Sequence, residues 1–301
     1  MQVTGKRDYG SILGKVSTHT ILEDYMDKCD DAGWGILMYL RLDAYSGADQ
    51  SDSSTDGYVG NEVALYNFME RHRDSKCGGG VYWDGGRDYK NTVTNGLYTL
   101  VSAMLALVHP DKSSYLNNAK DNWDWMLKSG LRDADNLWFD GMHLRGGGCN
   151  VDGKVKYTYN QGLFISASGA LYRLTGDGKY LDEAEKTLDA VISGMTEHDI
   201  LREGCDGFGC NHDAQLFKGC FMKHLMYYLD YAPDNRRYKY AGFLHAQVSG
   251  VEHYATNGNG DPGNIWYEPA SSTNNFVVSA WTVSAGLAAH VAAAKWGKCA
   301  P

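Results

Sequence analysis

The stretch Leu97-Tyr-Thr-Leu-Val-Ser-Ala-Met-Leu-Ala-Leu-Val108, followed by His109-Pro-Asp-Lys112, decides the fold of this chain. Its apolar residues recur at positions 97, 101, 104, 105 and 108, the spacing of a helix that buries one stripe against other helices. The proline-containing segment breaks that helix and leaves room only for a short turn. A second helix must then fold back along the first, so the stretch predicts a helical hairpin.

The same unit recurs along the chain. Tyr115-Leu-Asn-Asn-Ala119 and Tyr180-Leu-Asp-Glu-Ala184 resemble each other, lie 65 residues apart and each follow a short turn. Helical periods recur throughout, whereas convincing strand alternation does not. We expect helices near residues 9–19, 31–46, 59–73, 91–108, 113–129, 160–175, 178–195, 214–231, 236–255 and 276–297.

Short and long connections alternate between these helices. Short turns would lie on one face of the molecule, and long loops rich in Gly and aromatic residues on the other, where a site can be built from many segments. The long loops are 47–58, 74–90, 131–159, 196–213 and 256–275. The pattern predicts an all-α toroid of helical hairpins, in one continuous domain over residues 1–301. A helical solenoid fits the period equally well, but it does not explain the concentration of such loops on one side.

The overall composition excludes some classes of partner. The 37 acidic and 28 basic residues give a formal charge of −9, which argues against a nucleic-acid partner bound through its phosphates. No apolar stretch approaches the roughly 20 residues of a membrane span. Residues 1–6, Met-Gln-Val-Thr-Gly-Lys, lack the apolar region of a signal peptide, so we expect either a cytosolic protein or one whose leader was removed.

The seven cysteines favour the second alternative, and with it a secreted or cell-wall-associated protein. Several lie in Gly-rich loops where a bridge is sterically easy. We expect two disulfides, Cys205–Cys210 and Cys77–Cys149. The alternative is a set of reduced, buried thiols, which fits cysteines that lie within helical patterns, namely Cys29 and Cys220.

A metal site is the third interpretation of the cysteines. Cys205, Cys210 and His212 cluster, but their spacing matches no strong zinc-finger pattern and no second Cys/His pair lies nearby. The ten histidines are otherwise scattered without ligand spacing. We therefore expect neither a metal nor a cofactor.

Two adjacent carboxylates, Asp30 and Asp31, directly precede an apolar, aromatic helix that begins with Trp34. Like charges this close disfavour double ionisation, so one carboxyl should have a raised pKa. One protonated acid beside one carboxylate is the pair that glycoside cleavage needs. The alternative is a helix cap, because Asp at an N-terminus accepts backbone N–H bonds and suits the helix dipole.

The long loops are rich in groups that bind sugars. The chain has 21 Tyr and 8 Trp, and aromatic faces cover the C–H face of a pyranose. Amides and carboxylates supply paired hydrogen bonds to hydroxyls. The aromatic residues at loop–helix junctions include Trp34, Tyr82, Trp83, Tyr89, Trp138, Phe139, Tyr157, Tyr159, Trp266 and Tyr267. Any one of them is more simply explained as core, and the case for a polysaccharide cleft rests on their joint placement.

Four further motifs follow the Asp pair in order: Cys77-Gly-Gly-Gly-Val-Tyr-Trp83, Tyr89-Lys-Asn-Thr-Val-Thr-Asn-Gly96, Tyr157-Thr-Tyr-Asn-Gln-Gly162 and Phe217-Lys-Gly219. Together the five resemble glycoside hydrolase family 76, the endo-α-1,6-mannanases, and its fungal cell-wall relatives. The resemblance runs from about residue 9 to about residue 231 and is weaker beyond.

This resemblance implies an (α/α)6 barrel and a retaining, endo-acting α-1,6-mannanase, with Asp30 as nucleophile and Asp31 as general acid/base. It implies α-mannan or a mannose-containing cell-wall glycan as substrate, and we expect a monomer. The alternatives are a cell-wall transglycosidase, in which a sugar replaces water, and a non-catalytic mannan-binding protein. The substrate-binding candidates are Trp34, Trp83, Lys90, Asn91, Asn95, Asp140, Tyr159, Asn160, Gln161 and Lys218.

Two features depart from the family pattern. Only 29 residues precede Asp30, and the expected helices number fewer than the twelve of a six-hairpin ring, so the first N-terminal helix is missing or helices lie within 47–58 or 256–275. Gly33 and Gly35 flank Trp34 where the family tends to place a second bulky aromatic.

For Lys90 and Lys218 a structural ion pair competes evenly with a substrate contact.

Overall fold

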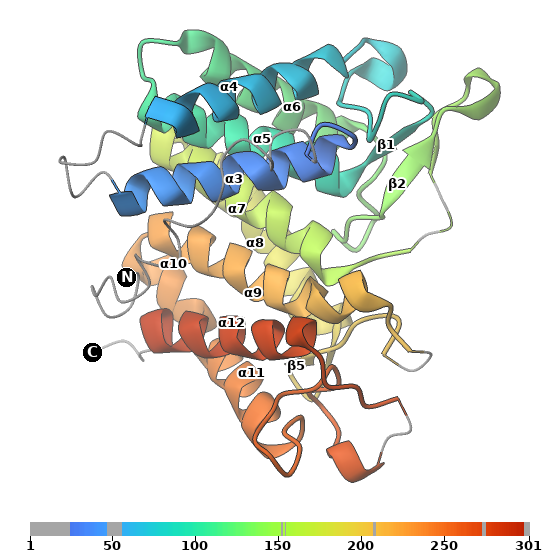
Figure 1. Ribbon diagram of the computed structural model, residues 1–301, viewed down its shortest axis with the longest axis vertical. Coiled ribbons are helices and arrows are strands. Elements are labelled where there is room, and N and C mark those ends of the chain that lie inside the picture. Colours follow the sequence, from blue (N-terminus) through green and yellow to red (C-terminus); the bar gives the residue numbers. More distant parts are fainter. Residues whose placement is uncertain are drawn as a thin grey trace. The chain divides into compact units, whose positions relative to one another are not determined.

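The computed structural model describes residues 25–46, 56–151, 153, 155–206, 209–272 and 275–297. The chain divides into two compact units. Unit 1 comprises residues 1–131 and 141–152, and unit 2 comprises residues 132–140 and 153–301. Helices form most of each unit, as expected for an all-α protein (Figure 1).

Unit 1 contains two pairs of consecutive helices and a small sheet. Its elements are α3 (Cys29–Ser46), α4 (Asp56–Arg71), η1 (Lys76–Gly78), β1 (Tyr89–Asn91), α5 (Thr92–Val108), α6 (Ser113–Lys128), β2 (Gly141–His143), η2 (Arg145–Gly147) and β3 (Asn150–Val151). α3 packs on α4 and α5, and α5 packs on α6. β1, β2 and β3 form an antiparallel sheet in which Lys90 lies opposite Met142.

α5 is the most deeply buried helix of unit 1. Its N-cap is Asn91, whose side-chain oxygen accepts the Thr94 N–H at 3.2 Å. The stripe predicted from the sequence is buried along most of its length, with Leu97, Val101 and Leu105 inaccessible to solvent. The predicted hairpin is confirmed, because α6 follows after a short turn and lies against α5.

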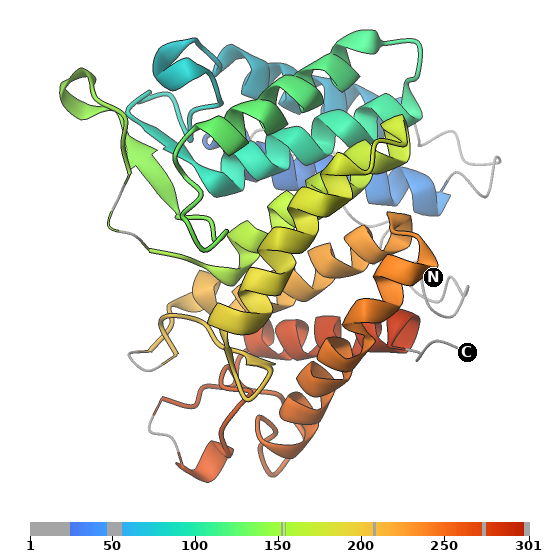
Figure 2. The ribbon, with the colours of Figure 1, turned by 180° about the vertical axis from the view of Figure 1, so that it is seen from behind.

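Unit 2 is built around α9. Its elements are α7 (Thr158–Thr175), α8 (Lys179–Gly194), β4 (Thr196–Glu197), β5 (Ile200–Leu201), α9 (His212–Tyr231), α10 (Asp234–Arg237), η3 (Tyr238–Tyr240), α11 (Ala241–His253), η4 (Ala270–Ser272) and α12 (Ala280–Trp296). α9 packs on both α7 and α12, α7 packs on α8, and α11 packs on α12. Figure 2 shows the pair α7–α8 and the helices α11 and α12 from behind.

Glycines allow the helices of unit 2 to approach closely. A Cβ on Gly169 of α7 would lie 3.2 Å from the Cα of Tyr228 on α9. A Cβ on Gly219 of α9 would lie 2.4 Å from the Cα of Ala285 on α12. Backbone therefore meets backbone at both interfaces, which a larger residue would prevent.

The helix predictions are confirmed for nearly all of the described chain. The exception is 236–255, where the structure has α10, a 3-10 turn and α11 instead of one helix. The predicted helix at 9–19, and most of the 47–58 loop, lie outside the described residues. Segment 256–275 contributes only the short η4 among the residues described there. The single continuous domain stays a prediction.

The sequence patterns did not indicate the five short strands. Each is two or three residues long, too short to show a period of two. Helices long and apolar enough to cross a bilayer are absent from the part of the chain that the structure describes.

Candidate active site

Asp30 and Asp31 lie in the first turn of α3, half-buried. The helix begins against the loop that carries Trp83, because the N–H of Cys29 donates to the Trp83 carbonyl oxygen at 2.7 Å. Trp34 follows one turn later and is also half-buried. Residues three apart share a helix face, so Trp34 lies on the same side of α3 as Asp31.

Two N–H groups converge on the Asp30 carboxyl group. The indole Nε1–H of Trp83 donates to Oδ1 and Oδ2, each at 3.0 Å. The main-chain N–H of Asp31 donates to Oδ1, also at 3.0 Å. Burial and the charge of Asp31 raise the pKa of Asp30 to about 6, and the two donors oppose this rise. The carboxyl pair therefore keeps one proton up to mildly acidic pH, as the sequence suggested.

The Trp83 indole is itself fixed by its neighbours. The Trp83 N–H donates to the Tyr89 carbonyl oxygen at 2.9 Å. The two rings meet edge to face, with centroids 6.4 Å apart and planes at 86°. Trp83 was predicted as a stacking residue for sugar, and the structure gives it a second task as the hydrogen-bond donor to Asp30.

Lys90 makes the contacts of a structural ion pair, the alternative to a substrate contact. Its side chain is completely buried. The ammonium donates to Asp74 Oδ1 at 2.9 Å and to the carbonyl oxygens of Lys76 and Gly79 at 2.8 and 2.6 Å. All three donors of the ammonium are thereby used, so the competing ion-pair interpretation is the one that the contacts support.

Asn91 and Asn95 hold the backbone and offer no exposed amide. Asn91 is 5% exposed and caps α5. Asn95 is fully buried, accepts the Val81 N–H at 2.8 Å, and donates to the carbonyl oxygens of Val81 and Asn91 at 3.0 and 2.8 Å. These contacts join the Gly-rich loop to the start of α5, and hydroxyl binding by the two amides stays a prediction.

In unit 2 the structure brings Asp140 and Asn160 together. The Asn160 amide donates to Asp140 Oδ1 at 3.1 Å. Asp140 is held by its own N–H, which donates to the Val155 carbonyl oxygen at 2.8 Å. The Asn160 side-chain oxygen is buried and has no hydrogen-bond partner among the described residues. An acceptor left in this state suits a ligand hydroxyl.

Tyr159 belongs to an aromatic cluster near the start of α7. Its ring stacks on Phe217 of α9, with centroids 4.0 Å apart and planes at 13°. Tyr157 meets the Phe217 ring at 63° and 5.1 Å. In the sequence, Phe217 stands out only as part of the Phe217-Lys-Gly219 motif, and its stacking on Tyr159 was not predicted. The two residues are too far apart in sequence for a local pattern to pair them.

Gln161 is buried and ties α7 to the loop before it. Its Oε1 accepts the Trp138 N–H at 2.8 Å, and its Nε2 donates to the carbonyl oxygens of Trp138 and Tyr157. The amide is therefore used within the protein, and a contact of Gln161 with a sugar hydroxyl stays a prediction.

Lys218 also makes the contacts of a structural ion pair. It is 1% exposed and pairs with buried Asp206 at 2.7 Å. Asp206 accepts the N–H of Glu203, whose carboxylate in turn accepts the N–H and hydroxyl of Thr158 at the start of α7. Burial raises the pKa of Glu203 to about 7. The sequence did not single out this acidic pair, which holds the loop after β5 against α7 and α9.

Both predicted disulfides are confirmed, Cys77–Cys149 in unit 1 and Cys205–Cys210 in unit 2. Cys29 and Cys220 carry free thiols, as the alternative for those two positions expected. The disulfide leaves no thiolate for zinc beside His212, so the zinc alternative is wrong at this place.

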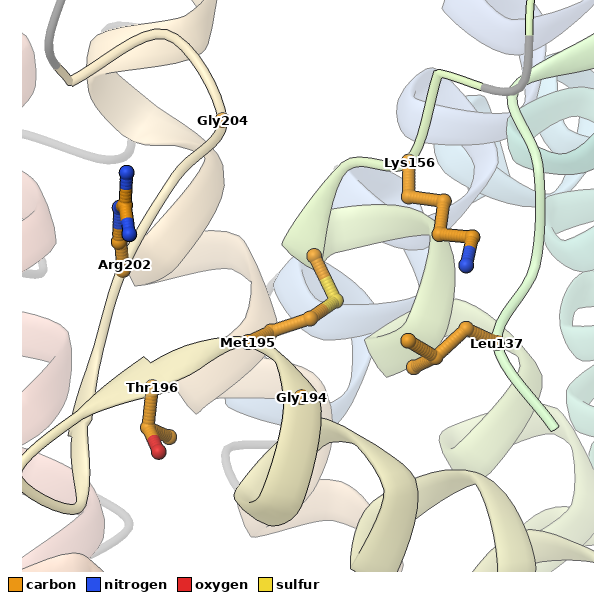
Figure 3. A pocket seen from close by; sticks show the side chains of 7 residues that line it. All are labelled: Leu137, Lys156, Gly194, Met195, Thr196, Arg202 and Gly204. Atoms are coloured by element: carbon orange, nitrogen blue, oxygen red, sulfur yellow. The ribbon is translucent and has the colours of Figure 1, made fainter. Parts of the chain in front are cut away.

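A pocket of about 270 Å³ in unit 2 has none of the predicted site residues in its lining (Figure 3). It is lined by Leu137, Lys156, Gly194, Met195, Thr196, Arg202 and Gly204. Lys156 pairs with Asp133, and Arg202 with Glu197 at 3.5 Å. Its two cations are thus balanced by carboxylates, and the pocket has no acid–base pair of its own.

Comparison with known protein families assigns the chain to one family. The sequence model described as Glycosyl hydrolase family 76 matches residues 14–295, and the chain belongs to this family. The solved structures of the family have an (α/α)6 fold, which this chain shares. The toroid prediction is therefore confirmed over the solenoid.

Curated relatives are fungal. The mannan endo-1,6-alpha-mannosidase DCW1 of Candida albicans is 30% identical over 211 residues, which cover 65% of this chain and 45% of that protein. The mannan endo-1,6-alpha-mannosidase DFG5 of Saccharomyces cerevisiae is 31% identical over 209 residues, covering 65% and 44%. The chain thus spans about half the length of the curated relatives that it matches.

Similar solved structures come from bacteria and fungi. An inactive variant of the alpha-1,6-mannanase GH76A of Salegentibacter sp. HEL1_6, with two consecutive aspartates replaced by asparagine, was solved with alpha-1,6-mannotriose; it has a TM-score of 0.76 at 23% identity and covers 89% of this chain and 76% of that one. Dfg5 from Chaetomium thermophilum, in complex with glucosamine, has a TM-score of 0.74 at 18% identity and covers 91% and 69%.

Proposed function

We propose that this chain is a retaining, endo-acting α-1,6-mannanase that hydrolyses α-1,6-mannan backbones with Asp30 and Asp31. The observation that carries the proposal is the carboxyl pair at the start of α3, in which N–H donors converge on Asp30 and one proton is retained. Membership of family 76 and the names of the relatives support the substrate. The inactive bacterial variant, altered at two consecutive aspartates, supports the role of the pair.

The hydrogen bonds of Asp30 support the proposed roles of the two aspartates. A carboxylate that accepts N–H bonds is stabilised in its ionised form, so Asp30 is suited to be the nucleophile. Asp31 is then the general acid, and the single proton that the coupled pair keeps must lie on it when substrate is bound. Carboxyls on consecutive residues can reach the roughly 5 Å separation of a retaining enzyme, but not easily the larger gap that an inverting enzyme needs for water.

The reaction proceeds in two displacements. Asp31 protonates the departing glycosidic oxygen while an Asp30 oxygen attacks the anomeric carbon, which gives a covalent mannosyl-enzyme and a shortened chain. Asp31, now ionised, removes a proton from water, and the resulting hydroxide oxygen displaces Asp30. Both carboxyls return to their starting protonation states, and the anomeric configuration is retained.

Three of the remaining predicted residues are available to hold sugar. The buried, unsatisfied oxygen of Asn160 beside Asp140 suits a hydroxyl pair. The stacked Tyr159 offers an aromatic surface for the C–H face of a pyranose.

The two disulfides support an oxidising compartment, and so a secreted or cell-wall location.

Digestion of unbranched α-1,6-mannan tests the proposal. Wild type should release oligosaccharides of mixed length, and Asp30→Asn and Asp31→Asn should each lose at least about 1,000-fold in kcat. Asp121→Asn, an exposed aspartate of α6, is the control and should keep full activity. Added azide should restore the activity of Asp31→Ala with a product of retained anomeric configuration, and that of Asp30→Ala with a product of inverted configuration. The two outcomes assign the general acid/base and the nucleophile.

The same digest separates the alternatives. Products longer than the supplied oligosaccharides would identify a transglycosidase that uses a sugar hydroxyl in place of water. Mannan binding by wild type without any turnover would refute the enzyme and favour the non-catalytic binding protein.

A further inference from the structure

An ion pair lies against the indole that holds Asp30. Lys28 Nζ is 2.8 Å from Asp84 Oδ2 and lies over the Trp83 ring, 4.6 Å from its centroid. The backbones of Lys28 and Asp84 also form an isolated antiparallel bridge. The segment before α3 and the loop after Trp83 are therefore joined by both main chain and side chains.

The contacts around Trp83 leave its indole little freedom. The main-chain carbonyl oxygen of Trp83 accepts the Cys29 N–H, and the main-chain N–H of Trp83 donates to the Tyr89 carbonyl oxygen. The Tyr89 ring meets the indole edge to face. Lys28 adds a cation above the ring, which is attracted by the electrons of the indole face. The Nε1–H is the only polar atom of this side chain, and it points at Asp30.

We propose that Lys28 and Asp84 are positioning residues for the reaction, acting together as a clamp that holds the Trp83 indole where it donates to Asp30. This inference rests on the proposed function and deepens it, because it assigns the device that keeps the nucleophile ionised and aimed. A cation above an indole also draws electron density from the ring, so the N–H becomes a better donor to a carboxylate.

The clamp acts through Trp83 because the ion pair is neutral as a whole. Within the described part of the chain, the charged or titratable groups around Asp30 are Cys29 and Asp31 on α3, together with Lys28, Asp84 and Arg87. Asp84 raises the pKa of Lys28, and Lys28 lowers the pKa of Asp84, so both stay charged while the aspartate pair titrates. Lys28→Met alone leaves the Asp84 charge unbalanced, so the cycle with Trp83→Phe is needed to separate a direct effect of that charge from the loss of the Asp30 hydrogen bond.

A double-mutant cycle over Lys28→Met and Trp83→Phe tests the clamp. Carbon-13 NMR of the aspartate carboxyls, assigned with Asp30→Asn, measures the Asp30 pKa without any substrate. Trp83→Phe should raise it by about one pH unit, since a donor to the charged form is lost. Lys28→Met should raise it by about half as much, and should add nothing in the Trp83→Phe background.

Activity on α-1,6-mannan gives the second readout. Lys28→Met should lower kcat about threefold to tenfold with little change in KM, and should move both limbs of the pH profile to higher pH. Lys28→Arg keeps a cation that can pair with Asp84 and lie on the ring, so it should restore most of the loss. Circular dichroism and urea unfolding of each variant establish that it is folded.

Lys179→Met is the matched control. Lys179 Nζ also lies over an aromatic ring, 4.9 Å from the Tyr180 centroid, and 3.5 Å from Asp177 Oδ2. Its removal should leave the Asp30 pKa and kcat unchanged. Additive effects of Lys28→Met and Trp83→Phe, or a rise in KM alone, would overturn the clamp in favour of an independent contact. If wild type fails to cleave mannan, the NMR cycle still decides the clamp, and only the proposed function is lost.

Discussion

Asp30 shows how a residue acquires chemistry from its surroundings. Burial raises the pKa of Asp30, and so does the charge of Asp31, which the sequence places directly beside it. The tertiary structure supplies the opposing effect, an indole N–H from a loop 53 residues away. Asp30 lies in the first turn of α3, where one of its oxygens also accepts the N–H of Asp31.

We expect mannanase activity to fall as the pH rises through about 6. The two carboxyls titrate as a coupled pair that shares one proton up to about pH 6, and loss of that proton leaves Asp31 with none to donate. Because the folded-state pKa of Asp30 exceeds its ordinary value, this group makes the fold less stable as the pH rises from about 4 to about 6, and it adds no further change above. A pH–rate profile, with thermal unfolding of wild type and Asp30→Asn in parallel, measures both effects. An activity that still rises above pH 7 would contradict the assignment.

Lys90→Met should destabilise the fold by about 3 kcal/mol, because it leaves Asp74 and two carbonyl groups without their shared donor. Urea unfolding measures the loss. Lys76→Met, at an exposed position in the same loop, is the control and should lie within about 0.5 kcal/mol of wild type. A stable Lys90→Met that lost only mannan affinity would restore the substrate interpretation.

At the scale of elements, helix packing decides which substitutions the chain tolerates. Ala in a helix normally stabilises relative to Gly by about 1 kcal/mol. Gly219 of α9 cannot realise this gain, because the new Cβ would meet the Ala285 backbone of α12 at 2.4 Å. The same interfaces explain why the 3.6-residue pattern predicted the helices so well: each buries a face against a neighbour.

We predict opposite effects for two Gly-to-Ala variants within helices. Gly219→Ala should destabilise by about 1–3 kcal/mol through the clash with α12. Gly60→Ala in α4 meets nothing within 4 Å and should stabilise by about 0.5–1 kcal/mol. Urea midpoints of the two variants compare them directly. Equal stabilisation in both would show that α9 and α12 can separate without cost.

At the scale of the whole molecule, the two disulfides constrain very different lengths of unfolded chain. Cys77–Cys149 spans 72 residues and Cys205–Cys210 spans 5. In the chain-entropy treatment the longer loop contributes about 4 kcal/mol and the shorter about 2 kcal/mol. The long bridge also joins the Gly-rich loop that leads to Trp83 with the β2–β3 hairpin.

Removal of each disulfide by paired Cys-to-Ala substitution tests this difference. The loss of unfolding free energy should be about twice as large for Cys77–Cys149, as measured in urea at fixed pH. Reduction of wild type by dithiothreitol should reproduce the sum of the two losses. A larger effect from the short bridge would place its contribution in the native state, where it holds Glu203 and Asp206 in the buried network.

The sequence by itself determined the helices, both disulfides and the family, because each depends on local periodicity, loop composition or ordered motifs. It also marked Asp30 and Asp31, since their crowding is visible in the chain. Only the tertiary structure separated positioning residues from ligand groups. The side chains of five predicted sugar binders are buried and make hydrogen bonds within the protein, many of them to segments distant in sequence; the five are Lys90, Asn91, Asn95, Gln161 and Lys218. Burial and hydrogen bonding are properties of those long-range contacts, and no local spacing encodes them.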